Sequence, residues 1–267
     1  MSPRSYLYVP ADRPEMLAKA GERGADALIV DLEDAVAPSR KVEARRILAD
    51  FLPGPIETWV RVNSHPDQLA EDAAVAGGAA GIVLAKAEPE TLSRAVSLTS
   101  LPIMPLVETA AGLQAASELA SADGVERLAV GEADLSAELG VTLGDDEVEL
   151  LYARSQLVVA SAAAGIDAPS GPVFTDFRDS DGLRRSTEAL VRLGFGSRPA
   201  IHPAQVQVIN EVFTPTEEQV SDAREMIEGF EAAVAAGAGV AAADGVMIDE
   251  AVVRQARRVL DRVPGGP

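Results

Sequence analysis

The chain has 267 residues, of which 47% are hydrophobic, and it contains no cysteine. This is enough apolar material for one large domain, and it excludes disulfides, thiolate zinc sites and a cysteine nucleophile. The formal net charge of −19 disfavours contact with nucleic-acid phosphates, and the absence of a signal peptide or an apolar run of about 18 residues predicts a cytoplasmic protein with no membrane partner.

Short apolar runs alternate with segments of helical periodicity along most of the chain. Apolar runs bounded by turn residues are typical of buried parallel strands. We expect eight strands, at Ser5–Val9, Ala27–Asp31, Thr58–Val62, Gly81–Leu84, Ile103–Val107, Arg127–Val130, Gly165–Ala168 and Ala200–His202. We expect their partner helices at Pro14–Ala20, Val42–Asp50, Asp67–Ala76, Pro89–Val96, Gly112–Ala120, Asp146–Ala164, Gly182–Leu193 and Pro203–Val212.

Eight alternating units predict an α/β fold, a (β/α)8 TIM barrel over residues 1–213. The alternative is a doubly wound sheet, but no Gly-x-Gly-x-x-Gly motif follows the first strand, which weakens it.

Residues 214–267 form a predicted C-terminal helical extension of the same domain. Its expected parts are a capping box (Thr214 with Glu217, or Thr216 with Gln219), a helix at Glu217–Ala236, a flexible Gly/Ala connector at Ala236–Gly245, a short element at Val246–Asp249 and a helix at Glu250–Val263. A closed barrel does not need this extension. We therefore expect it to pack on its own barrel or to cross to a neighbouring subunit.

Polar side chains follow the predicted strands at their carboxyl ends, where the active sites of α/β barrels lie. They are Asp31, Glu33, Asp34, Arg61, Asn63, Lys86, Glu108, Glu132, Asp134 and His202. Glu108 and Asp134 end adjacent strands, and two carboxylates that leave room for water and substrate suit Mg²⁺. With no cysteine and two histidines, a zinc site is disfavoured. We predict a metal site from the strand-end group taken together, although for any single carboxylate alone we would favour a helix N-cap or a solvated loop.

Arg61 interrupts the apolar run Trp59–Val62. Its guanidinium suits a substrate carboxylate or a developing oxyanion, and the alternative is a structural ion pair with Asp31 or Glu33. For Lys86 we favour a structural pairing with Glu33. His202 is expected to cap the last barrel helix or to orient a ligand. No Gly-x-Ser-x-Gly elbow supports Ser/His/Asp catalysis.

Seven stretches carry a family resemblance, in order and over nearly the whole chain. They are Tyr6–Pro10, Val30–Val36, Val60–Asn63, Val107–Thr109, Gly131–Leu135, Ala200–Gln205 and Gly245–Asp249. Together they resemble the citrate lyase β-subunit-like family of the HpcH/HpaI aldolase/citrate lyase superfamily. The resemblance implies a TIM barrel that assembles as a homotrimer.

The resemblance also assigns residues to roles. Glu108 and Asp134 match the family's Mg²⁺ ligands. Arg61 matches a catalytic, substrate-binding arginine, and Glu108 also contacts the substrate through the metal. Asp249 matches an acid/base aspartate that the extension places in a neighbouring subunit's site.

Further positions match contacts to coenzyme A. These are Tyr8 and Lys19, and the loop at Ile201 and His202 lies near the same ligand. The chain departs from the family pattern at Pro10-Ala11, Ala85-Lys86 and Ala168–Pro172. These departures lie near the site mouth and bear on which acyl group is accepted.

The predicted function is a Mg²⁺-dependent carbon–carbon lyase. It would cleave or form a 3-hydroxyacyl thioester, such as citryl-, malyl- or citramalyl-CoA, from a keto acid and an acyl thioester. One alternative is an aldolase on a free 2-keto acid, but such enzymes carry a histidine where Asp31–Asp34 stands. Others are a thioester-binding subunit of a larger lyase complex, and a lyase whose thioester is borne by an acyl carrier protein.

Overall fold

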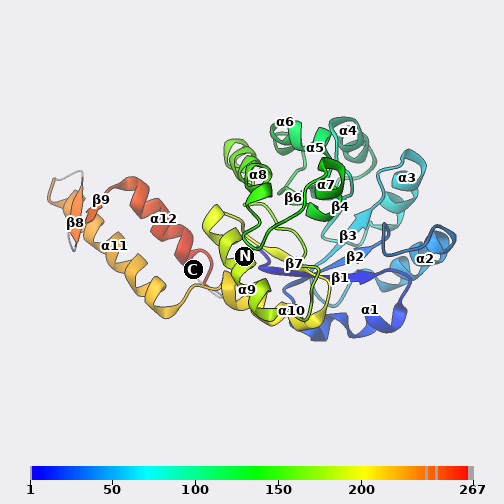
Figure 1. Ribbon diagram of the computed structural model, residues 1–267, viewed down its shortest axis with the longest axis horizontal. Coiled ribbons are helices and arrows are strands. Elements are labelled where there is room, and N and C mark those ends of the chain that lie inside the picture. Colours follow the sequence, from blue (N-terminus) through cyan, green and yellow to red (C-terminus); the bar gives the residue numbers. More distant parts are fainter. Residues whose placement is uncertain (1, 238–239, 244–245, 264–267) are drawn as a thin grey trace. The chain divides into compact units, whose positions relative to one another are not determined.

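The computed structural model describes residues 2–237, 240–243 and 246–263 (Figure 1). The chain divides into two compact units. The larger is Pro3–Asn210, and the smaller holds the segment from Glu211 onward. The division lies close to the predicted end of the barrel at residue 213.

Seven parallel strands form one sheet in the larger unit. They are β1 (Ser5–Pro10), β2 (Ala27–Asp31), β3 (Thr58–Val62), β4 (Gly81–Leu84), β5 (Ile103–Val107), β6 (Ala129–Val130) and β7 (Arg198–Ala200), in the order β6-β5-β4-β3-β2-β1-β7. Single parallel bridges join Ser170 to Ala129 in β6 and to Ser197 next to β7. These bridges link the two edges of the sheet and give a TIM-barrel-like α/β fold.

Helices surround these strands (Figure 1). They are α1 (Pro14–Ala20), α2 (Lys41–Phe51), α3 (Pro66–Val75), α4 (Pro89–Leu98), α5 (Ala110–Gln114), α6 (Ala116–Ala120), α7 (Glu132–Leu139), α8 (Leu151–Ala164), α9 (Ser180–Leu193) and α10 (Pro203–Phe213), with 3₁₀ turns at Gly21–Arg23, Pro38–Arg40 and Val148–Leu150. None of the helices in the described ranges has the length and hydropathy to cross a membrane.

The predicted seventh strand at Gly165–Ala168 is wrong. Gly165 instead ends α8 in a left-handed conformation with φ of +71°. Its place in the ring is taken by Ser170, which lies between Pro169 and Pro172. Because proline has no backbone N–H to donate to a ladder, this segment pairs by single bridges and not as a strand.

Further predictions differ from the structure: the strand expected at Arg127–Val130 covers only Ala129–Val130, and the helix expected at Asp146–Ala164 begins at Leu151. The predicted last strand at Ala200–His202 begins earlier, at Arg198, and ends before His202. Helix α7 is absent from the predicted elements, because its first turn carries the polar residues assigned to a strand end. The single helix predicted at Gly112–Ala120 is divided between α5 and α6 at Ala115.

The barrel interior is filled by large apolar side chains, and Trp59 is among its largest fully buried residues. Gly81 on the neighbouring strand makes room for that ring, since a Cβ on Gly81 would overlap the ring atom Cζ3 of Trp59. The glycine is required here by close approach and not by its backbone dihedrals.

We expect Gly81→Ala to lower the free energy of unfolding by about 1–3 kcal/mol, because the methyl group overpacks the barrel against a ring that cannot move. Urea denaturation followed by tryptophan fluorescence measures this change. Gly77→Ala is the matched control, since no atom lies within 4 Å of the position that its methyl group would take. An unchanged denaturation midpoint for Gly81→Ala would contradict this packing account.

The smaller unit is a helical hairpin with a short antiparallel ribbon. It contains α11 (Glu217–Ala235), β8 (Ala241–Ala243), β9 (Val246–Ile248) and α12 (Glu250–Leu260). Phe230, Ile248 and Val253 form its core. Of the two predicted capping boxes, the one that forms is Thr216 with Gln219. The predicted Gly/Ala connector includes β8, and its residues 238–239 and 244–245 lie outside the described part of the chain.

Candidate active site

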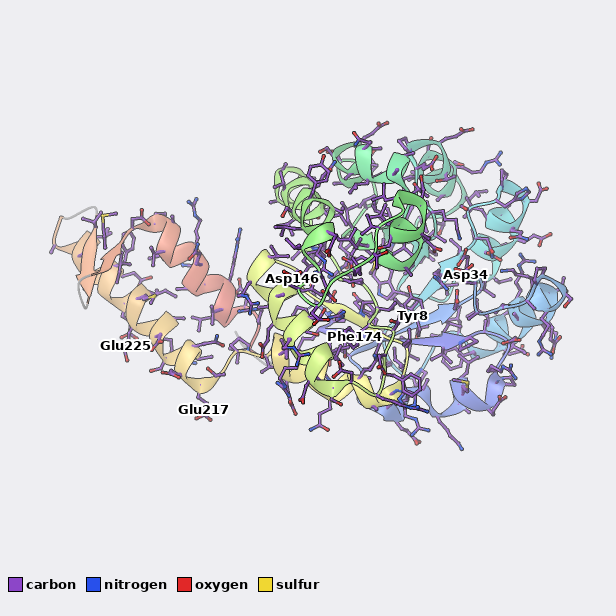
Figure 2. All side chains as sticks on the ribbon, viewed as in Figure 1. Tyr8, Asp34, Asp146, Phe174, Glu217 and Glu225 are labelled. Atoms are coloured by element: carbon purple, nitrogen blue, oxygen red, sulfur yellow. The ribbon has the colours of Figure 1, made fainter. Side chains whose placement is uncertain are left out.

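A cavity of about 350 Å³ opens at the carboxyl ends of the barrel strands. Five of the predicted site residues line it: Tyr8, Arg61, Glu108, Asp134 and Ile201. Figure 2 shows Tyr8 between Asp34 and Phe174 in this view of the larger unit. The barrel therefore brings together side chains from opposite ends of its sequence, from Tyr8 in β1 to Ile201 just after β7.

Arg61 projects from β3 into this cavity and is held there by a carboxylate on the adjacent strand. Its Nε and one terminal nitrogen donate to the two oxygens of Asp31 at 2.7 and 2.6 Å. Its other terminal nitrogen lies 3.5 Å from Glu33, and its guanidinium lies 5.0 Å from the centre of the Tyr8 ring. Arg61 therefore lines the cavity and at the same time forms the predicted ion pair with Asp31.

These contacts, together with burial, set the charge states of Arg61 and Tyr8. Burial acts to lower the pKa of Arg61, but the hydrogen bonds to Asp31 and the neighbouring negative charges outweigh it, so the pKa lies above its ordinary value. Burial raises the pKa of the Tyr8 hydroxyl, because an apolar environment disfavours the charged phenolate. Near neutral pH a fixed guanidinium cation thus lies over a neutral phenol ring.

Glu108 directly follows β5 and is only 3% exposed. One of its oxygens accepts a hydrogen bond from the backbone N–H of Lys86 at 2.7 Å. Gly131 leaves room for the carboxylate, since a Cβ there would lie 2.5 Å from Glu108 Oε2. Burial, together with a smaller effect of the negative charge of Asp134, raises the pKa of Glu108 to about 7 against the opposing effects of Lys86 and Arg61.

Lys86 positions Glu108 through a strained backbone. Its φ is +47°, in the left-handed region that non-glycine residues seldom adopt. Its ammonium donates to Glu33 at 2.6 Å, so the predicted Lys86–Glu33 pairing is confirmed. The backbone N–H and the side chain of this one residue therefore connect the β2 loop to Glu108.

Asp134 lies in the first turn of α7, where the helix dipole favours a negative charge. Glu132 in the same turn accepts two hydrogen bonds from Arg154 at 2.5 and 2.7 Å. Arg154 also contacts Glu147 at 2.8 Å. This buried network anchors the start of α7 against α8. Glu132 is among the residues predicted from the sequence, but Arg154 and Glu147 are not, although an arginine within the otherwise small and apolar face of α8 is a signal that could have found this network.

The donor set of the cavity suits a hard divalent cation. Glu108 and Asp134 both line it, and their mutual repulsion is relieved by a cation between them. Within residues 2–237, 240–243 and 246–263, no group of three or more His, Asp or Glu side chains is placed to hold a metal. A pair of carboxylates, with the remaining positions left to water and substrate, is an arrangement that suits Mg²⁺.

The other predicted site residues lie elsewhere. His202 stacks on Phe177 with 4.7 Å between ring centres, and its Nδ1 accepts from the backbone N–H of Ala204 at the start of α10. Its predicted capping role is thereby confirmed. Lys19 is exposed in the last turn of α1 and is not among the cavity residues. Asp249 belongs to the smaller unit, where its side chain caps α12.

The chain is similar in sequence to a malyl-CoA thioesterase and to citrate lyase beta subunits. It is 35% identical to a (3S)-malyl-CoA thioesterase from Cereibacter sphaeroides, over 96% of this chain and 93% of the relative. It is 34% identical to citrate lyase subunit beta from Leuconostoc mesenteroides, over 96% and 92%.

A solved structure has the same fold. The protein CitE from Mycobacterium tuberculosis, in complex with magnesium, acetoacetate and coenzyme A, superposes with a TM-score of 0.84 and 32% identity over 97% of both chains. Residues 4–203 match the HpcH/HpaI aldolase/citrate lyase family. The chain belongs to the HpcH/HpaI aldolase/citrate lyase family.

Proposed function

We propose that this protein is a Mg²⁺-dependent carbon–carbon lyase that cleaves, or in reverse forms, a 3-hydroxyacyl-CoA thioester. The observation that carries the proposal is one cavity that combines the carboxylates of Glu108 and Asp134 with the guanidinium of Arg61. A relative named for malyl-CoA, a relative that is a citrate lyase subunit, and a neighbour that binds magnesium and coenzyme A all support it.

Glu108 and Asp134 would hold the metal. Bound there, Mg²⁺ would polarise the oxygens of the keto-acid half of the substrate. Arg61 would stabilise the enolate oxygen of the thioester half as the carbon–carbon bond breaks, because its cation is already held rigidly by Asp31. Asp31, Glu33 and Asp34 would act indirectly, by orienting Arg61 and water at the site.

Asp249 would act as the general acid/base: its carboxylate would take the proton of the substrate 3-hydroxyl as the carbon–carbon bond breaks and return that proton to the carbanion of the leaving thioester. In this proposal the protein is a homotrimer, and the C-terminal extension of each subunit supplies Asp249 to a neighbour's cavity. In the smaller unit Asp249 Oδ1 accepts from the backbone N–H groups of Ala251 and Val252 at 2.9 and 3.0 Å, which fixes the side chain at the start of α12. Tyr8, Lys19, Ile201 and His202 would contact coenzyme A.

The direct test is a panel of 3-hydroxyacyl-CoA esters incubated with the purified protein, with and without Mg²⁺. We expect at least one ester to yield a keto acid together with acetyl-CoA, and the reaction to stop when EDTA is added. Release of free coenzyme A with an intact hydroxy acid would instead indicate a thioesterase. If no thioester in the panel reacts but the protein cleaves free 2-keto-acid aldols, the aldolase alternative would replace the thioester lyase proposal.

A further inference from the structure

The cavity offers almost no positive charge that is free to bind a substrate. Within the described part of the chain, Arg61 is the one cationic side chain that lines it. That guanidinium already donates to both oxygens of Asp31. Lys86 lies nearby but is not among the lining residues, and its ammonium is bound to Glu33. The cations at this end of the barrel are therefore matched by carboxylates of the protein itself.

The remaining charge in the lining is negative. Asp34 and Glu132 line the cavity in addition to Glu108 and Asp134. Glu132 is neutralised by Arg154. A divalent cation would offset Glu108 and Asp134. Asp34 lies 3.9 Å from the Lys86 ammonium, and its side chain is 60% exposed. One substrate carboxylate can bind at the metal, but a second one would meet no unmatched cationic side chain among the described residues of this chain that line the cavity.

The inner wall of the cavity is apolar. It is formed by Ile29, Val83, Met104, Leu106 and Ala129, each at most 5% exposed. These side chains belong to β2, β4, β5 and β6 and pack in one cluster with Tyr8 against it. A carboxylate turned toward this wall loses its hydration without gaining a partner, whereas a hydrogen or methyl group in the same place costs nothing.

We infer that the cavity accepts a 3-hydroxyacyl group with a single free carboxylate, such as malyl or citramalyl, and rejects the citryl group, which carries a second one. This inference rests on the proposed function and narrows its substrate. Malyl, citramalyl and citryl thioesters differ in the substituent on the carbon that bears the hydroxyl: hydrogen, methyl and carboxymethyl. The apolar wall and the matched cations select between these substituents.

The test compares kcat/KM for malyl-, citramalyl- and citryl-CoA at saturating Mg²⁺. We expect the value for citryl-CoA to be lower by at least about 100-fold than that for the better of the other two. A citryl-CoA analogue whose carboxymethyl arm is amidated separates charge from size. It should recover at least about tenfold of the loss, because the amide has the shape of the carboxylate without its charge. Equal rejection of the amide would attribute selection to size and overturn the inference.

A binding measurement gives a readout apart from turnover. Calorimetric titration of pyruvate and oxaloacetate into the protein with Mg²⁺ should give a dissociation constant at least about tenfold weaker for oxaloacetate, the keto acid with the second carboxylate. Comparable citryl-CoA cleavage and comparable oxaloacetate binding would overturn the inference and leave the proposed function standing. Failure of every thioester to react and of both keto acids to bind would overturn both.

Discussion

Glu108→Gln is expected to lower kcat/KM of the Mg²⁺-dependent reaction by about 100-fold or more. The same substitution is expected to stabilise the metal-free protein at pH 8. The amide still accepts the hydrogen bond from the Lys86 backbone N–H and keeps the shape that fits against Gly131. It removes the buried negative charge that a divalent cation needs. Initial rates over a range of Mg²⁺ concentrations, in parallel with unfolding in EDTA, measure both effects.

The sign of the stability change follows from the pKa of Glu108. Burial raises that pKa from 4.5 to about 7 in the folded, metal-free protein. Between these values the folded state binds more protons than the unfolded state, so stability falls as pH rises and the full cost is present above pH 7. The gain from Glu108→Gln should therefore be on the order of 3 kcal/mol at pH 8 and should vanish near pH 4.

The matched control is Glu138→Gln, on the same side of the barrel but outside the cavity lining. Glu138 accepts a hydrogen bond from the Ala110 backbone N–H at 3.2 Å, which the amide oxygen retains. This variant should keep wild-type activity and show no pH-dependent gain. A Glu108→Gln protein that is still activated by Mg²⁺, or that is less stable than wild type in EDTA at pH 8, would contradict the assignment of Glu108.

Two inactive variants are expected to restore activity when they share an oligomer. Asp249→Asn removes the proposed acid/base carboxylate, and Glu108→Gln removes a metal ligand. If each site takes Glu108 from one subunit and Asp249 from a neighbour, every cyclic trimer that contains both variants has both intact residues in about a third of its sites. Co-expression with two affinity tags, tandem purification and the lyase assay measure the recovery.

Asn is the substitution of choice at position 249 because Asn caps helices as well as Asp does. It retains an oxygen for the backbone N–H groups of Ala251 and Val252, so α12 keeps its start. Glu250→Gln next to it is the control and should be fully active. Mixed oligomers with no more activity than the two pure variants would place Asp249 and Glu108 in separate sites or within one subunit.

Much of the barrel follows from local sequence pattern. The four strands β2 to β5 have the predicted bounds, Ala27–Asp31, Thr58–Val62, Gly81–Leu84 and Ile103–Val107. Each is a short run of mostly apolar residues, interrupted in β3 by Arg61, and a parallel strand buried on both faces has that composition whatever its neighbours are. The polar residue at the end of such a run also follows directly. Arg61 inside one such run, Glu108 directly after another and Asp134 shortly after β6 can be selected without knowledge of any contact, and all three line one cavity.

The places where prediction failed are those where one segment depends on a distant one. Ser170 completes the ring through bridges to Ala129 and Ser197, and nothing near Ser170 in the sequence marks it as a strand. Helix α7 follows β6 at once, and its first turn is anchored by Arg154 of α8. The hydrophobic pattern of a short sequence window carries no information about a hydrogen-bond partner that lies 22 or more residues away.

The sequence by itself determined the alternation of strands and helices, the family, and the acidic and cationic residues at the strand ends, because these depend on local composition and order. Only the tertiary structure decided how those residues act on one another. The left-handed backbone of Lys86 aims its N–H at Glu108, and burial raises the pKa of that carboxyl. Asp31 holds Arg61 with its charge already matched. Distances, burial and charge pairing arise from contacts between strands, and these exist only once the barrel has closed.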